Sequence, residues 1–312
     1  MSSAAASTQA PHRDWEAWLA TASHPASPTE EEQRDRTETR IRDAIARAPD
    51  IPSSVWVYAK GSYANNTNVS RDADVDIAVE WTNTIKVMKW GDTVGMTAEQ
   101  LGYVPATEPI TPIEFRRRVE RALATAFDSQ TIDTTPDKHI GVAAGSNTLD
   151  ADVVPCFALN RYDAPGYPVR GHRIFPKSGA AHVDNYPKQN YDNGVAKNNA
   201  TRRRYKEIVR CTKRLVGELY DERIITRDYP GYLIECLVFN APNSCFGHTR
   251  RYDDMQALLR FLWNGLAEEG TYNSWTEPSK LLMLFRGRPD RIPGNARNVI
   301  GQAWLRMGGP SA

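Results

Sequence analysis

The stretch DVDIAVE at residues 74–80 requires a sheet that is buried on one face and charged on the other. Alternate side chains of a strand lie on the same face, so Asp74 and Asp76 stand together while the apolar residues between them enter a core. Two carboxylates about 4 Å apart repel each other by roughly 4 kcal/mol at an effective dielectric constant near 20. We therefore expect a proton or a cation to be held between them. Asp72 precedes the apolar alternation, and we assign it to the turn SRDA.

Two further segments extend this acidic site. In LDADVVPCF, residues 149–157, Asp150 and Asp152 share a face of a strand, and one of them can supply a third carboxylate. Gly61 and Ser62 form a tight turn at the end of an earlier strand, where a backbone N–H and a hydroxyl can approach a triphosphate. Three carboxylates on adjacent strands favour Mg²⁺ and suit two-metal chemistry, with one ion at the attacking hydroxyl and the other at the leaving pyrophosphate. Each motif alone is common, but together they predict nucleotidyl transfer.

Strand and helix signals alternate over the first 160 residues. We expect one helix to start at Thr29, with a capping box to Glu32. A second helix is expected at Thr111, with Pro112 at its first position and Glu114 closing the box. Strands are expected over residues 53–59 and 74–80, and in the segments 139–145 and 147–159 around a turn at 145–147.

The pattern becomes helical in the second half of the chain. Helices are expected at about 200–221, 230–241, 252–268, 277–286 and 294–306. We predict a flexible arm at 1–12, a core at 13–160 whose helix at 29–48 packs across both lobes, a crossover segment at 161–199 and a helical lobe at 200–312. The active-site cleft is expected between the two lobes.

Composition excludes several classes of protein. The 312 residues carry 39 basic and 38 acidic side chains, a net charge of +1, which argues against a protein that coats duplex nucleic acid. The four cysteines form no C-x-x-C pair, so we expect reduced thiols in the core rather than a zinc site. No stretch approaches the roughly 18 apolar residues of a membrane helix. We expect a cytoplasmic protein that binds no membrane.

The acidic motif resembles that of a known family. Gly61, Ser62, Asp74, Asp76 and Asp152 match the G-S-x(n)-D-x-D signature and later aspartate of polymerase-β-type nucleotidyltransferases, and more closely of the cGAS/DncV-like nucleotidyltransferases (CD-NTases). The resemblance favours the second acid of the later pair because the family places its third carboxylate directly before a short apolar stretch. Its fold would be α+β, a polymerase-β-like core with a mixed sheet and a second, helical lobe. The segments 185–215 and 231–242 are most similar to clade E.

The resemblance also implies roles for three residues in substrate binding. Asn185 falls on the position that reads uracil, where a carboxamide can pair with O4 and N3–H. Lys213 matches a lysine that contacts the triphosphate, and Tyr232 matches an aromatic residue that stacks on a base. Without the family, Asn185 would start a turn, Lys213 would belong to a solvated basic face and Tyr232 to a core. Many relatives have Ser where this chain has Gly231, which removes one phosphate contact.

The function implied by the resemblance is cyclic dinucleotide synthesis. UTP and ATP are the expected substrates, and the product would be cyclic UMP-AMP or cyclic di-UMP, made with two Mg²⁺ ions for which Mn²⁺ can substitute. The product would activate a downstream effector in CBASS anti-phage defence, and the enzyme would be a monomer. Three alternatives stay open: a related transferase acting on RNA ends or a small-molecule hydroxyl, a catalytically silent nucleotide-binding regulator, and a structural protein.

Overall fold

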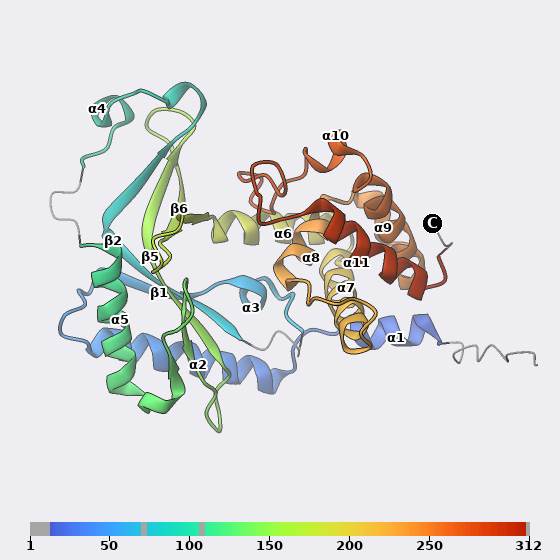
Figure 1. The fold of residues 1–312 in the computed structure, drawn as a ribbon, viewed down its shortest axis with the longest axis horizontal. Coiled ribbons are helices and arrows are strands. Elements are labelled where there is room, and N and C mark those ends of the chain that lie inside the picture. The colour runs from blue at the N-terminus through green and yellow to red at the C-terminus, as the bar shows by residue number, and fades with distance from the viewer. Residues whose placement is uncertain (1–12, 70–73, 106–109, 310–312) are drawn as a thin grey trace, which may run out of the picture. The chain divides into compact units, whose positions relative to one another are not determined.

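Two compact units make up the described part of the chain. The computed structural model describes residues 13–69, 74–105 and 110–309 (Figure 1). The sheet unit comprises Pro25–Ala196 and Thr276–Met283, and the helical unit comprises residues 13–24, 197–275 and 284–309. We predicted domain boundaries near 160 and 200, and the chain passes from one unit to the other between residues 24 and 25, 196 and 197, 275 and 276, and 283 and 284. The predicted arm at 1–12 and Asp72 lie outside the described residues.

A mixed sheet forms the centre of the sheet unit. Its seven described strands are β1 (Val55–Ala59), β2 (Val75–Lys89), β3 (Ile132–Asp133), β4 (Ile140–Val142), β5 (Ala151–Tyr162), β6 (Pro168–Ile174) and β7 (Val183–Asn185). The order is β1-β2-β5-β4-β3, while β6 pairs with the later part of β5 and β7 pairs with β6. Only the β2–β5 pair is parallel among the described strands. The predicted α+β fold with a mixed sheet is confirmed.

One face of this sheet is buried by two helices, α2 (Pro28–Arg47) and α5 (Pro112–Ala126), which Figure 1 shows beside the strands. Ile77 of β2 and Val153 of β5 pack there against Ile41 of α2 and Phe115 of α5. A parallel pair needs a long crossover connection, and α5 lies within the connection between β2 and β5. The apolar side chains predicted from the alternation thus enter this core, which leaves the aspartate face uncovered by α2 and α5.

The helix starts differ in part from the prediction. Helix α2 starts two residues earlier than expected: Ser27 is the N-cap, and its capping box is with Glu30 instead of the box between Thr29 and Glu32. The reason is Pro28, whose fixed φ suits the first helical position and whose missing N–H would be unpaired there anyway. At α5 the Thr111 cap is confirmed, but the carboxylate of Glu114 accepts a hydrogen bond from Arg118 at 3.1 Å.

The segment 161–199, which we predicted to be a crossover between lobes, contains regular structure that we did not predict. It contains β6, β7 and helix α6 (Pro187–Ala200). Its many Gly, Pro and Asn residues concealed these elements, and α6 has a polar sequence in which Gly194 is the one residue classed as buried. Strand β2 also continues well past the predicted end at residue 80, with a register shift between Trp81 and Lys86.

The helical unit has its own apolar core. Its helices are α1 (Trp15–Ala22), α7 (Arg204–Asp221), α8 (Gly231–Asn240), α9 (Arg251–Gly265), α10 (Glu269–Tyr272) and α11 (Pro293–Arg306), so four predicted helices are confirmed within a few residues. The predicted helix at 277–286 is wrong. Residues 276–283 form a turn closed by a bridge between Thr276 and Met283, with Lys280 in the left-handed region at φ +61°. A residue in the left-handed region in the middle of the segment interrupts a right-handed helix.

Two further expectations concern the cysteines and membrane-spanning helices. All four cysteines are free and buried, as predicted. Within the described ranges, every helix is too short or too polar to span a bilayer.

Candidate active site

The parallel pairing of β2 and β5 brings the predicted carboxylates together. Asp76 stands directly opposite Asp152 in this register, and Asp74 lies one residue before β2 starts. Burial is the main cause that raises the pKa of Asp152, and the negative charges of Asp76 and Asp74 raise it further. The three acids are therefore within electrostatic reach of one another, and their oxygen atoms are ligands of the kind that a hard divalent cation prefers.

Two basic side chains that we did not predict contact these acids. The ammonium of Lys60 donates to Oδ1 of Asp76 at 3.0 Å, and Nε2 of His139 lies 3.2 Å from Oδ1 of Asp152. The side chain of Lys60 is only 14% exposed, so this contact is shielded from water. Lys60 directly precedes the Gly-Ser turn, a position that could have drawn attention to it. His139 could be found only from the pairing of β4 with β5.

Gly61 is required at its position for steric reasons. Its φ is +70°, in the left-handed region, and a Cβ atom built there would lie 2.1 Å from Oδ2 of Asp76. The backbone N–H of Lys60 also donates to the carbonyl of Asp76 at 2.8 Å, which joins the turn to the strand. Ser62 follows in the first turn of the short helix α3 (Gly61–Asn65). The structure thus brings the predicted turn against the predicted carboxylate.

The choice between the two later aspartates has a structural counterpart. Oδ1 of Asp150 accepts a hydrogen bond from the backbone N–H of Ala144 at 2.7 Å, so this carboxylate supports the turn between β4 and β5. Asp152 instead faces Asp76. A pocket of about 330 Å³ opens beside them, lined in part by Asp74, Asp133, His139, Asp150 and Asp152. This volume is at the lower end of the range for small-molecule sites.

Asn185 lies at the end of β7, opposite His172 of β6. Its Nδ2 is 3.4 Å from Nε2 of His172, a long hydrogen bond. Gly171 permits the close approach of the two strands, because a Cβ there would be 2.5 Å from the carbonyl oxygen of Asn185. Asn185 is the last residue of a strand, so it does more than start a turn.

The remaining predicted residues belong to the helical unit. Lys213 is on α7 and is 4% exposed, which excludes the alternative of a solvated basic face. Tyr232 is the second residue of α8, half-buried against the helical core, and Gly231 is the first. Their roles in substrate binding stay predictions.

Comparison with known proteins identifies the family. Residues 192–308 match the model of the cGAS/DncV-like nucleotidyltransferase C-terminal helical domain. The cyclic dipyrimidine nucleotide synthase CdnE of Legionella pneumophila is 34% identical over 295 residues, which cover 93% of this chain and 97% of that protein.

Two solved structures are similar over nearly the whole chain. The Rhodothermus marinus CdnE c-UMP-AMP synthase with Apcpp and Upnpp has a TM-score of 0.79 at 27% identity, covering 95% of this chain and 98% of that one. The Elizabethkingia meningoseptica CdnE cyclic dinucleotide synthase with GTP and Apcpp has a TM-score of 0.78, also at 27% identity, and covers 95% and 100%. The chain therefore belongs to the cGAS/DncV-like nucleotidyltransferases, among the CdnE cyclic dinucleotide synthases.

Proposed function

We propose that this enzyme joins two nucleoside triphosphates into a uridine-containing cyclic dinucleotide, cyclic UMP-AMP or cyclic di-UMP. The observation that carries the proposal is the register that sets Asp76 opposite Asp152, with Asp74 beside them. The same sheet bears Asn185 on its last strand. A carboxylate pair for phosphoryl chemistry and a carboxamide suited to a base are thus built into one framework.

Each residue of the site has a part in this reaction. Gly61 and Ser62 would bind the triphosphate of the donor nucleotide, since the turn has no side chain at Gly61 to obstruct close approach. Asp152, whose pKa is raised by burial, is suited to accept the proton of the attacking 3′-hydroxyl. Lys60 holds the carboxylate of Asp76 in place. Mg²⁺ held by Asp74, Asp76 and Asp152 would neutralise charge on the phosphates and favour ionisation of the attacking hydroxyl.

Uridine is supported by Asn185 and by the names of two relatives. The carboxamide offers an acceptor for N3–H and a donor for O4 of uracil, and a base lacking these groups would leave its polar atoms unpaired. The Legionella relative is called a dipyrimidine synthase and the Rhodothermus one a c-UMP-AMP synthase. Lys213 and Tyr232 would add a phosphate contact and a base-stacking contact, respectively.

We also propose the biological setting. The product, rather than a protein contact, would activate a CBASS effector. The enzyme would work as a monomer in the cytoplasm, where its nucleoside triphosphate substrates are made.

The test is product analysis with each pair of labelled nucleoside triphosphates. The protein is incubated with Mg²⁺ or Mn²⁺, treated with phosphatase, and the resistant material is identified by mass. We expect a cyclic product that contains uridine and that disappears in EDTA. The absence of a resistant product from every nucleotide pair would contradict the proposal, and labelling of added RNA instead would favour a transferase that acts on RNA ends.

Two aspartate variants make this test specific. Asp152→Asn should abolish the product, because the amide is neutral and cannot accept the proton. Asp150→Asn is the matched control: it lines the same pocket, and its amide oxygen can still accept from the N–H of Ala144. Comparable loss of product in both variants would show that the assignment of the third carboxylate is wrong.

A further inference from the structure

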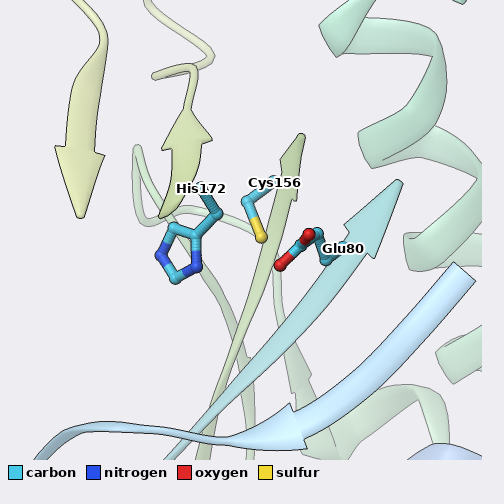
Figure 2. Close-up of side chains that lie close together, drawn as sticks. All are labelled: Glu80, Cys156 and His172. Carbon is cyan, nitrogen blue, oxygen red and sulfur yellow. The ribbon is translucent and has the colours of Figure 1, made fainter. Parts of the chain in front are cut away.

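A second polar cluster lies in the sheet unit and contains none of the three carboxylates of the active site. Figure 2 shows the side chains of Glu80, Cys156 and His172, from β2, β5 and β6, pointing toward one another. Their ligating atoms all lie within 4.8 Å of one another, and each residue is at most 6% exposed. A carboxylate, a thiol and an imidazole at such distances could bind a metal ion or form a hydrogen-bonded network.

The contacts of the cluster favour the network. The hydroxyl of Tyr58 donates to Oε2 of Glu80 at 2.6 Å and lies 2.9 Å from Nδ1 of His172, so it already links two of the three groups. The thiol of Cys156 donates to the carbonyl of Val79 at 3.6 Å. Burial raises the pKa of this thiol well above its usual value, which disfavours the thiolate that a metal would need.

The positions of the protons follow from these contacts. Burial raises the pKa of Glu80, whereas the hydrogen bond from Tyr58 favours its ionised form. When Glu80 is a carboxylate, the single hydrogen of the Tyr58 hydroxyl is donated to it, and the hydroxyl oxygen then accepts from Nδ1–H of His172. Burial and the nearby charge of Lys60 lower the pKa of His172 to about 3, which keeps the ring neutral at physiological pH. Its other nitrogen, Nε2, is then an acceptor, and Nδ2 of Asn185 is the donor that faces it.

We propose that Glu80, Tyr58 and His172 form a positioning relay that fixes the orientation of the Asn185 carboxamide and thereby selects uracil over cytosine. One N–H of the carboxamide is held by His172, which leaves Oδ1 and the second N–H for a base. Uracil presents an acceptor at O4 and a donor at N3–H, whereas cytosine presents a donor at N4 and an acceptor at N3. A carboxamide rotated by 180° would match cytosine, so holding it in one orientation rejects the wrong pyrimidine. This inference rests on the proposed role of Asn185 in reading uracil.

The first experiment measures the choice between UTP and CTP by the full-length enzyme. In Tyr58→Phe the relay is interrupted, and we expect the ratio of kcat/KM for UTP to that for CTP to fall about three- to tenfold, the effect of losing one hydrogen bond. The KM for a purine nucleotide should stay unchanged. Cys156→Ala is the matched control, since it alters the same cluster without touching the relay, and it should keep the wild-type ratio.

The second experiment does not depend on activity. The spectrum of ¹⁵N-labelled histidine distinguishes the two neutral tautomers, and the loss of one signal in His172→Gln assigns the residue among the six histidines. We expect His172 to be neutral with its proton on Nδ1 from pH 6 to 8. A proton on Nε2, a charged ring, or stoichiometric zinc that is lost in His172→Gln would overturn the relay.

The outcomes separate this inference from the proposed function. If the wild-type enzyme makes no uridine-containing product, the proposed function fails and the assignment of selectivity fails with it. If it makes that product and Tyr58→Phe keeps the wild-type ratio of UTP to CTP use, only the relay is refuted.

Discussion

Replacement of Gly61 by alanine should separate catalytic geometry from general stability. A Cβ at this position would lie 2.1 Å from Oδ2 of Asp76, and such atoms essentially never approach within 3.0 Å. The carboxylate must therefore move by at least 0.9 Å, the difference between these distances. A displacement of about 1 Å of a catalytic group can lower the rate about 100-fold, so we expect product formation in Gly61→Ala to fall by roughly that factor.

A matched variant controls for the backbone. Gly102 has a φ of +74°, close to the +70° of Gly61, but a Cβ at Gly102 meets no atom within 4 Å. Both alanine variants should lose about 1–2 kcal/mol for a side chain in the left-handed region, or a few degrees in Tm. Only Gly61→Ala moves a carboxylate of the site.

The assay measures cyclic product over time at saturating nucleotide and Mg²⁺, together with the thermal unfolding of both variants. Gly102→Ala should retain near wild-type turnover despite its lower Tm. If Gly61→Ala keeps turnover within about threefold of Gly102→Ala, the contact between Gly61 and Asp76 has no part in catalysis, and the steric argument is refuted.

Three further predictions concern charge and base choice. In EDTA, Asp152→Asn should raise Tm at pH 7, because the raised pKa of Asp152 means that its ionised form destabilises the fold. The gain in Tm over the wild type should disappear as the pH falls through that pKa, since the wild-type carboxyl then becomes protonated. An equal gain at all pH values from 4 to 8, measured by thermal unfolding, would contradict the charge argument. Asn185→Ser should lower uridine incorporation about tenfold by removing two hydrogen bonds, and an unchanged base composition of the product by mass would contradict the role of Asn185. In Gly171→Ala a Cβ would lie 2.5 Å from the carbonyl oxygen of Asn185, so the preference for uridine should fall. Product formation from purine nucleotides, which depends on Asp76, should persist. Equal loss of product from uridine and purine nucleotides would indicate general misfolding.

The carboxylates could be predicted because their signal is local. Alternation along a strand shows which side chains share a face, and an apolar strand with acids on one face is recognisable without its neighbours. The partners of those acids could not be predicted in the same way. His139 reaches Asp152 only because β4 pairs with β5, and that pairing is set by tertiary structure.

The largest errors arose where composition conceals regular structure. Strands β6 and β7 lie in a segment whose Gly, Pro and Asn residues we interpreted as a crossover between lobes, so the contact between His172 and Asn185 could not be anticipated. The start of α2 was misplaced because two residues that can cap a helix, Ser27 and Thr29, flank Pro28, and the proline decides between them. At residues 276–283 apolar periodicity favoured a helix, but the backbone at Lys280 turns instead.

The register between Asp76 and Asp152 also bears on how the enzyme acquires activity. The two residues are 76 positions apart in the chain, and they meet only when β2 and β5 pair in parallel. Contacts between such distant segments form slowly, because the loop between them must close before the contacts stabilise the chain. A chain that has formed its helices and hairpins but not this pair has no assembled carboxylate site. Catalytic competence should thus appear late in folding, and incompletely folded chains would make no cyclic dinucleotide.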